Sequence, residues 1–428
     1  MVNKINLIDE SRQFDLSERF FSITDSRGVI ECANDVFMRV SEYDPDEIID
    51  KPHNIIRHPD MPRCVFYLFW EYLKQGKVIG AYVKNLAKDG RYYWVYALVS
   101  SLGDRHISIR IKPSSDIFPI TKKLYKELVE HENNFSGNRQ DAMMSAYELL
   151  NTRLNELGFS TYDEFMNASL RVEMSAHSNE IQKQNTSLNY PKQGNNAIVV
   201  ARLIRVFAKL DQLVECGLSI KDKQSSFLFI DKELHSIATN TKFRAARLGS
   251  DGKSLCVVSD EISRTRVSIG IEIKRLNKDI SSIVSAITGA TLHSSLGYLQ
   301  LLTQVEFKNQ KENSQMKVAE QQVNFGWSLD AMSKVLSKCS DQSLNDFSKE
   351  IRRLSRSLNE FSEFISFIAR MIQVLDFSYV TGQSLSASIE STNEFRDILA
   401  GLKIVASRTT KDLNELRKSV SVAIDIIE

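Results

Sequence analysis

The sequence predicts an α+β domain with a five-stranded antiparallel sheet and helices, followed by an all-α region of long helices in a coiled coil or bundle. Three observations support this fold class. Strand-like runs rich in β-branched and aromatic residues cluster before residue 113. All seven prolines lie at or before Pro191. Beyond that point, apolar residues recur at alternating steps of three and four, which is the pattern of a helical seam.

The α+β domain begins with a predicted β-hairpin, because the sequence Asp-Ser-Arg-Gly at 25–28 is a turn signal between two strand-like runs. Short helical segments follow. A second turn, Lys88-Asp89-Gly90, joins two later strands. Two strands, helices and then three strands predict one antiparallel sheet. The predicted strands are 20–24, 29–32, 79–85, 92–101 and 106–112.

Residues 116–191 are predicted to form a helical linker. Segments 124–132 and 141–157 have helical patterns, and the polar run at 133–138 is typical of a loop. Residues 184–195 are expected to be a flexible connector.

The last 237 residues contain no proline. Proline costs about 3 kcal/mol inside a helix, so its absence permits long uninterrupted helices. An ordinary amphipathic helix in a globular core is the alternative, but the length of the second apolar seam favours a bundle. After that seam, a turn is predicted at 376–382 and a further helix at 384–428. The seams are Ile269, Ile273, Leu276, Ile280, Ile283 and Ile287, then Ile351, Leu354, Leu358, Phe361, Ile365, Ile368, Ile372 and Leu375.

Composition narrows the functional classes. Lys and Arg number 55 and Asp and Glu 54, for a net charge of +1, so nothing general favours nucleic acid or an anionic membrane. Five scattered cysteines argue against a disulfide framework or a zinc site, and we predict no metal. No run reaches the roughly 18 apolar residues of a membrane span, and no signal peptide is evident. A cytoplasmic location is expected.

The most specific motif is KPHNIIRHPDMP at 51–62, followed by Phe66, Trp70 and the Val-Lys-Asn of 83–85. Residues 10–115 resemble the PAS domain of bacterial aerotaxis transducers. The resemblance implies a cleft that holds FAD and reports its redox state. Arg57 is expected to pair with a phosphate, and Asp60 to accept from a ribose hydroxyl or to hold Arg57. The implied cofactor-binding residues are Asn34, Arg57, His58, Asp60, Phe66 and Asn85.

The family tryptophan before Val-Lys-Asn is replaced here by Ile79. Alternatives for the same residues are a loop-capping network made by Arg57, His58 and Asp60, an empty cleft, or a different small ligand. Haem needs an axial ligand. His53 and His58 qualify for that role by residue type alone.

Residues 233–263 resemble the hairpin tip of a methyl-accepting chemotaxis protein, with Gly249 and Gly252 at the turn. We therefore predict a hairpin over 192–310 with its tip near 248–252, and a second hairpin or bundle over 311–428. Three positions depart from the family: Phe243 replaces an isoleucine, Arg244 a glutamate, and Ser250 the glutamate after the turn glycine. A reversed charge at a packed contact excludes the usual partner. The implied partner-contact residues are Asn240, Phe243, Arg244, Val257 and Val258.

We predict no catalytic residues and no enzyme activity. His293 weakly resembles a histidine-kinase phosphoacceptor, but no ATP-binding boxes follow it. The expected function is a cytoplasmic redox, oxygen or small-ligand sensor whose helical output contacts proteins, such as the chemotaxis kinase-adaptor complex or other receptors, with the chain as a homo-oligomer. The alternative is a scaffold protein whose PAS fold does not sense.

Overall fold

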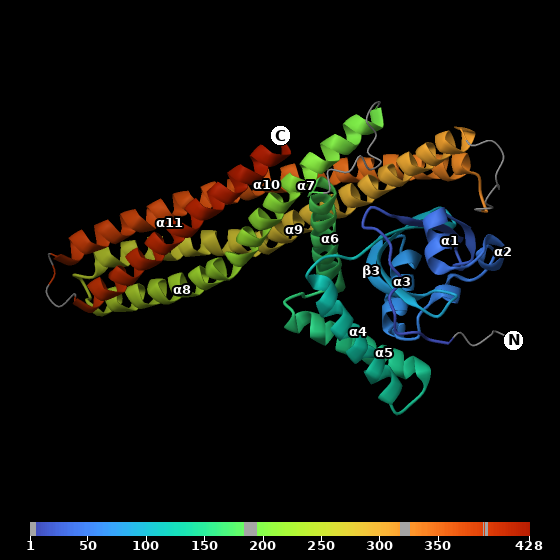
Figure 1. The fold of residues 1–428 in the computed structure, drawn as a ribbon. Coiled ribbons are helices and arrows are strands. Elements are labelled where there is room, and N and C mark those ends of the chain that lie inside the picture. Colours follow the sequence, from blue (N-terminus) through green and yellow to red (C-terminus); the bar gives the residue numbers. More distant parts are fainter. Residues whose placement is uncertain (1–5, 184–194, 317–325, 388, 390–392) are drawn as a thin grey trace. The chain divides into compact units, whose positions relative to one another are not determined.

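A computed structural model describes residues 6–183, 195–316, 326–387, 389 and 393–428 (Figure 1). The chain divides into two compact units. Unit 1 comprises 1–207 and 291–347, and unit 2 comprises 208–290 and 348–428. This division does not follow the sequential boundaries expected from the sequence, because two long helices each contribute one part to unit 1 and another part to unit 2.

Unit 1 contains one five-stranded antiparallel sheet with the strand order β2-β1-β5-β4-β3. The first and last strands are neighbours, with Phe21 opposite Ile109. The predicted α+β fold class is confirmed, and each strand lies within two residues of its expected range. The strands are β1 Phe20–Asp25, β2 Ile30–Ala33, β3 Ile79–Leu86, β4 Tyr92–Leu102 and β5 Arg105–Ile111.

Short helices connect β2 to β3. Asn34 caps the first of them: its Oδ1 accepts from the backbone N–H of Phe21 and Phe37, and its Nδ2 donates to the Arg19 carbonyl. Asn34 therefore ties α1 to β1. The connecting elements are α1 Asp35–Ser41, α2 Pro45–Ile48, the 3₁₀ helix η1 His53–Ile56 and α3 Arg63–Lys74.

The predicted linker is part of the core of unit 1. Helices α4 Ile117–Asn134, α5 Arg139–Glu156 and α6 Tyr162–Lys183 follow the sheet directly. The Phe118 ring stacks on Tyr82, with ring centroids 5.6 Å apart. The Tyr162 hydroxyl donates to the Gly80 carbonyl at 2.9 Å. These contacts place α4 and α6 on one face of the sheet. The expected connector at 184–195 lies almost wholly outside the described residues.

Two buried carboxylates join these helices to the α+β domain. Glu173 on α6 accepts from the Tyr82 hydroxyl at 2.8 Å and the Ser115 hydroxyl at 2.6 Å. Glu132 on α4 accepts from the backbone N–H groups of Arg63 and Cys64, which are otherwise unpaired donors at the start of α3. Each carboxylate satisfies polar groups that would be costly to leave unpaired in a core.

Parts of two long helices, α9 Lys253–Met316 and α10 Leu329–Ala387, complete unit 1. Phe307 of α9 packs edge-on against Phe21 of β1, with ring centroids 5.3 Å apart. Beside this contact, Arg19 forms an ion pair with Glu306. Helix α9 therefore rests on β1 on the same face of the sheet as α4 and α6.

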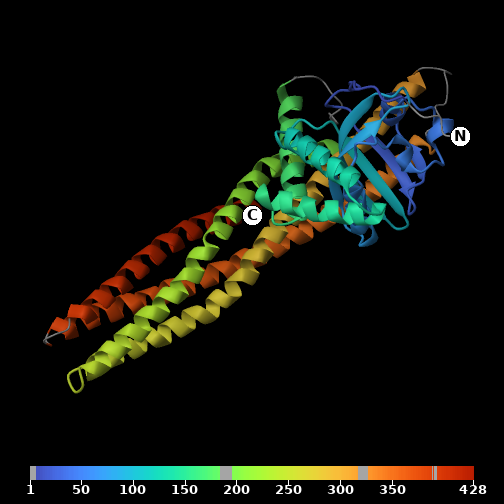
Figure 2. The same cartoon turned by 90° about the horizontal axis from the view of Figure 1, so that it is seen from below.

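Unit 2 consists of helices whose apolar seams are buried. It contains α7 Asn195–Asp222 from residue 208 onward, α8 Gln224–Arg247, parts of α9 and α10, and α11 Asn393–Ile427. The seam predicted over 269–287 is buried along its length, and the seam predicted over 351–375 is buried from Leu354 onward, whereas Ile351 is half-buried. The turn at 248–252 lies at the same end of the unit as the start of α11 (Figure 2). The second hairpin thus folds against the first.

The turn predicted at 376–382 is wrong, because α10 continues to Ala387. Gly382 serves close packing instead of a reversal: a Cβ at this position would lie 2.7 Å from the Leu399 Cδ1 of α11. The glycine that suggests a helix end in the sequence instead lets two helices approach.

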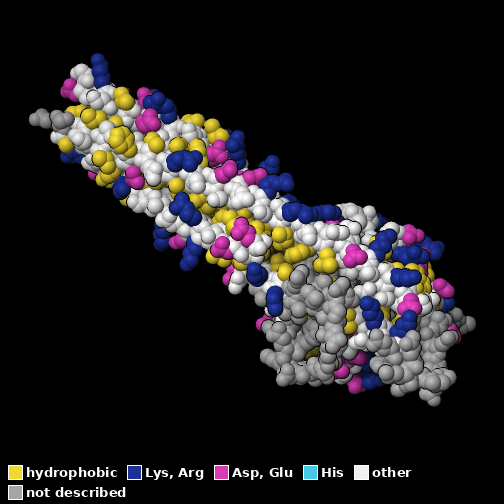
Figure 3. Space-filling view, turned by 90° about the horizontal axis from the view of Figure 1, so that it is seen from above, with side chains coloured by type: hydrophobic (Ala, Val, Ile, Leu, Met, Phe, Trp, Pro, Cys, Tyr) yellow, Lys and Arg dark blue, Asp and Glu magenta, His cyan; other side chains and the backbone are white. Residues whose placement is uncertain are grey.

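Among the described helices, α10 alone is long and apolar enough to cross a membrane by length and composition, a test that core helices of bundles also pass. The surface of the long helices carries hydrophobic side chains interspersed with Lys, Arg, Asp and Glu (Figure 3). Phe243 and Val257 beside the 248–252 turn are 56% and 64% exposed.

Candidate functional site

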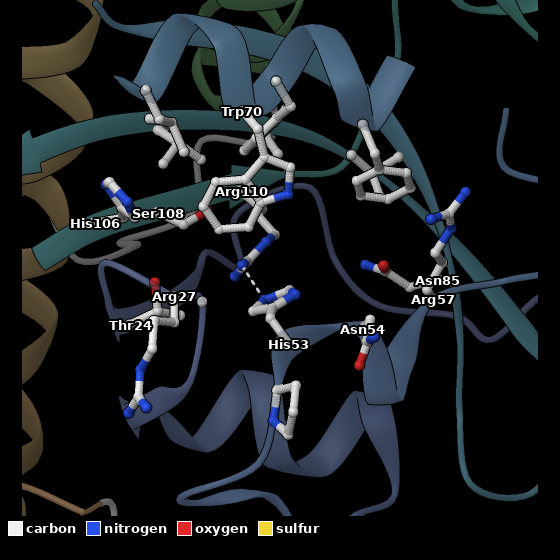
Figure 4. Close-up of a pocket in the computed structure, with 18 residues that line it drawn as sticks. Thr24, Arg27, His53, Asn54, Arg57, Trp70, Asn85, His106, Ser108 and Arg110 are labelled. Atoms are coloured by element: carbon white, nitrogen blue, oxygen red, sulfur yellow. Dashed lines mark hydrogen bonds between the residues drawn. The ribbon is translucent and has the colours of Figure 1, made fainter. Parts of the chain in front are cut away.

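A cavity of about 420 Å³ lies inside the α+β domain, between the sheet and the connecting helices (Figure 4). It occupies the face of the sheet opposite to α4, α6 and α9. Strand residues alternate between these faces because successive side chains of a strand point in opposite directions. On β5, His106, Ser108 and Arg110 line the cavity, whereas the isoleucines between them face the other way and are buried.

Helix α3 supplies an aromatic wall. Phe66, Phe69 and Trp70 lie one turn apart or adjacent on α3 and line the cavity. The turn between β1 and β2 fits closely against this wall: Gly28 has φ +81°, and a Cβ there would lie 3.0 Å from the Trp70 indole. A glycine at 28 therefore permits both the turn and the seating of the indole.

Arg110 is the most unusual polar group of the cavity. Its side chain is 4% exposed, and its Nη2 donates to Ser22 Oγ at 3.0 Å and to His53 Nε2 at 2.6 Å. Its Nη1 has no partner among the described residues, and neither does the buried Ser108 Oγ. Burial lowers the pKa of Arg110 to about 10, which leaves the guanidinium charged at neutral pH.

His53 of η1 is the second side chain, after Ser22, that accepts a hydrogen bond from Arg110. The cavity walls shield it from bulk solvent, although its ring borders the cavity and keeps some accessible surface. Burial, and secondly the charge of Arg110, lower the pKa of His53 well below its ordinary value. His53 is therefore neutral, and its Nε2 accepts from Arg110.

Arg57 lies at the other end of η1. Its guanidinium stands over the Phe66 ring, 4.2 Å from the centroid, and its Nη2 donates to the Met61 carbonyl at 3.1 Å. Burial lowers the pKa of Arg57. Asn85 of β3, which forms an isolated backbone bridge with Arg57, is 2% exposed and lines the same part of the cavity.

Comparison with known proteins agrees with this geometry. Residues 30–110 match the family model of the PAS fold. These residues form a PAS domain. The chain is homologous to the aerotaxis receptor of Escherichia coli strain K12, with 38% identity over 112 residues, 25% of this chain and 22% of the receptor.

A second homologue is the biofilm dispersion protein BdlA of Pseudomonas aeruginosa, 25% identical over 146 residues, which cover 33% of each chain. The chain thus spans between about a fifth and a third of the length of these relatives. A solved blue-light activated histidine kinase, Erythrobacter litoralis EL346, aligns with 38% of this chain and 53% of its own, at 10% identity and a TM-score of 0.23. That likeness is too distant to carry a functional argument.

The PAS cavity gathers half of the cofactor-binding residues expected from the sequence. Arg57, Phe66 and Asn85 line it. Asn34 does not, because its side chain is used in capping α1. Ile79 is fully buried and lies outside the cavity lining. The structure places Trp70 in the wall instead.

His58 and Asp60 also lie outside the lining, where they bond to each other and Asp60 bonds to Lys84 of β3. The backbone N–H of Asp60 donates to His58 Nδ1 at 3.1 Å, and Lys84 Nζ donates to Asp60 Oδ2 at 2.7 Å. Burial, and secondly the charge of Lys84, lower the pKa of His58 to about 4. These contacts agree with the loop-capping alternative for His58 and Asp60, whereas Arg57, the third member of that network, lines the cavity.

The lining residues that were not predicted as ligands include Trp70, His106, Ser108 and Arg110. The available signal was the sequence HISIRI at 106–111, in which polar side chains alternate with isoleucine. The same pattern fits a strand with one face in water. It therefore does not by itself indicate a cavity, which forms only because α3 and η1 cover that face of β5.

The expected partner-contact residues divide into exposed and buried groups. Asn240, Phe243 and Val257 are exposed, and Arg247 stands over the Phe243 ring, 4.3 Å from its centroid. Val258 is buried in unit 2. Arg244 forms an ion pair with Glu394 of α11, so its charge is neutralised within the chain.

Proposed function

We propose that this chain is a PAS sensor of chemotaxis-type signalling, in which the PAS cavity holds FAD and the state of the cavity is passed to the long helices. The observation that carries the proposal is a partly open cavity with an aromatic wall and a few fixed polar groups, in a domain homologous to the aerotaxis receptor. Pockets for small ligands have this composition and volumes of roughly 300–1,000 Å³.

The residues present fit the planar ring of a flavin. Trp70 and Phe66 offer flat apolar surfaces, and Asn85, Arg57 and Arg110 supply hydrogen-bonding groups along the cavity. When bound, FAD would supply reversible electron uptake. The chain's own residues would hold the ring, exclude water from it and set the charge around it, which are the protein's contributions in cofactor proteins.

A short route connects the cavity to α9. Arg110 donates to Ser22 on β1, and the neighbouring Phe21 packs on Phe307 of α9 on the opposite face of the sheet. Burial raises the pKa of Glu306 to about 7, while the adjacent Arg19 opposes that rise. A shift of β1 would therefore alter both an apolar and an ionic contact with α9.

We further propose that the output is a contact with other proteins, without catalysis, in the cytoplasm. Phe243 and Val257 present exposed apolar side chains beside the 248–252 turn. Their neighbourhood supports docking of a partner such as the chemotaxis kinase-adaptor complex or another receptor, with the chain as a homo-oligomer. The pairing of Arg244 with Glu394 leaves Phe243 and Val257 as the contacts to test first.

The cavity proposal is tested by an absorbance spectrum and a fluorescence titration of the purified full chain with FAD. We expect uptake of the flavin, and at least a tenfold weaker affinity in Trp70→Leu because a wall of the slot is lost. Tyr67→Leu is the matched control, since Tyr67 lies on the same helix but packs against Tyr147 outside the cavity. A wild-type chain that stays colourless with added FAD contradicts the flavin proposal and favours the scaffold alternative.

A further inference from the structure

We propose that Arg110 and Ser108 form an anion-recognition site, and that the cavity takes a ligand whose planar ring presents an acidic edge to them. This inference rests on the proposed sensing function and names the chemistry of its ligand. Strand β5 carries the two residues: its polar side chains point toward the cavity, and its isoleucines point away from it and are buried.

Arg110 is a buried positive charge with no negatively charged partner in the described part of the chain. Among the described residues, Arg110 takes part in no ion pair, and its hydrogen-bond acceptors are the neutral Ser22 and His53. Arg105 on the same strand behaves differently, because it pairs with Glu31 at 2.7 Å. A buried charge without an opposite partner is strongly unfavourable. A negatively charged ligand group in the cavity would supply the missing partner.

Arg110 Nη1 and the Ser108 hydroxyl lie on the same face of β5 and are hydrogen-bond donors without a partner among the described residues. His53 and Ser22 engage Nη2 of Arg110 and so fix the guanidinium, which leaves Nη1 unpaired. Ser108 lies two residues away on the same face of β5, about 7 Å along the strand, and its hydroxyl is also unpaired and buried. Figure 4 shows the His53–Arg110 bond inside the ring of lining side chains. Two donors along one strand suit two acceptors on the edge of one ring.

If the ligand is a flavin, Arg110 would affect its reduction potential. The pyrimidine edge of the flavin bears two carbonyl oxygens, and this edge gains negative charge on reduction. Charge near the ring tunes the reduction potential. Arg110 would therefore bind the reduced form more tightly than the oxidised form and raise the midpoint potential.

The test compares Arg110→Met with Arg105→Met, an arginine of the same strand that lies outside the cavity lining and is neutralised by Glu31. FAD affinity is measured by fluorescence titration and the midpoint potential by spectroelectrochemistry of the FAD-loaded full chain. We expect Arg110→Met to lose at least tenfold in its preference for the reduced form, which lowers a two-electron potential by about 30 mV. Arg105→Met should match wild type within twofold.

Thermal melting of the ligand-free chain separates recognition from a structural role. A methionine removes an unpaired buried charge at similar size, so Arg110→Met should melt at the same temperature as wild type or higher. An unfolded or clearly less stable Arg110→Met overturns the proposal, because Arg110 would then be needed to hold His53 and Ser22. Unchanged affinity and potential in a folded Arg110→Met overturn it equally.

A wild-type chain that takes up no FAD ends the flavin proposal without deciding this one. The probes are then 2-naphthoate and its neutral amide, 2-naphthamide, compared by thermal shift. We expect the carboxylate to raise the melting temperature of wild type more than the amide does, and to lose that advantage in Arg110→Met. Equal shifts from the two probes, or no shift from either, reject an anion site.

Discussion

Buried polar side chains decide how the PAS domain is held together. Glu132, Glu173 and His177 all come from the helices after the sheet, and each bonds to a group of the PAS domain or the segment before it. The sequence marks these residues only as members of polar helix faces. Their partners lie between 58 and 161 residues away in the chain, so local pattern cannot identify them.

His177 gives a pH dependence that can be measured. Burial lowers the pKa of His177 to about 4, and its Nε2 donates to the Leu16 carbonyl at 2.5 Å. The unfolded chain binds a proton at this histidine near pH 6.5, whereas the folded chain resists protonation until about pH 4. The free energy of unfolding should therefore fall as the pH drops through this window, by up to about 3 kcal/mol from this group.

The check is urea denaturation of wild type and His177→Gln at pH 7.5, 6, 5 and 4.5. We expect the stability difference between the two proteins to shrink as the pH falls, because glutamine keeps a donor and does not titrate there. Parallel stability curves would contradict the assignment of His177 as a buried neutral donor.

At the scale of elements, the five strands were predictable because β-branched and aromatic runs are separated by clear turn sequences, such as Asp-Ser-Arg-Gly at 25–28. The cavity was predictable in part. Arg57 and Phe66 follow from the family motif, whereas Arg110 depends on which face of β5 is covered. The end of α10 was misplaced because Gly382 has the same local appearance whether it stops a helix or admits a neighbouring one.

Gly382 and Gly401 give a matched pair for the packing of α10 against α11. A Cβ at 382 would lie 2.7 Å from Leu399 Cδ1, whereas a Cβ at 401 meets only Ile237 Cδ1 at 3.9 Å. Alanine favours helix by about 1 kcal/mol over glycine. We expect Gly401→Ala to raise the free energy of unfolding, and Gly382→Ala to be about 1–3 kcal/mol less stable than Gly401→Ala, because the Leu399 side chain must shift to admit the Cβ.

Chemical denaturation of both variants beside wild type measures this difference. Equal stabilisation by the two alanines would mean that α10 and α11 do not approach closely at Gly382.

In the whole molecule, the PAS sheet separates a cavity on one face from a long helix on the other. Phe21 and Phe307 form the apolar part of that junction, and Arg19 and Glu306 the ionic part. Helix α9 continues from residue 291 of unit 1 into unit 2, so a change at Phe307 has a covalent path to the 248–252 turn. Coupling of this kind requires that ligand binding change the packing of α9.

Hydrogen exchange of residues 301–310, measured on the full chain with and without FAD, tests that claim most directly. We expect bound FAD to change exchange in this segment of wild type. In Phe307→Ala, which truncates the contact with Phe21, FAD should still bind but leave exchange at 301–310 unchanged. Wild-type exchange that is identical with and without bound FAD would show that the cavity does not communicate with α9.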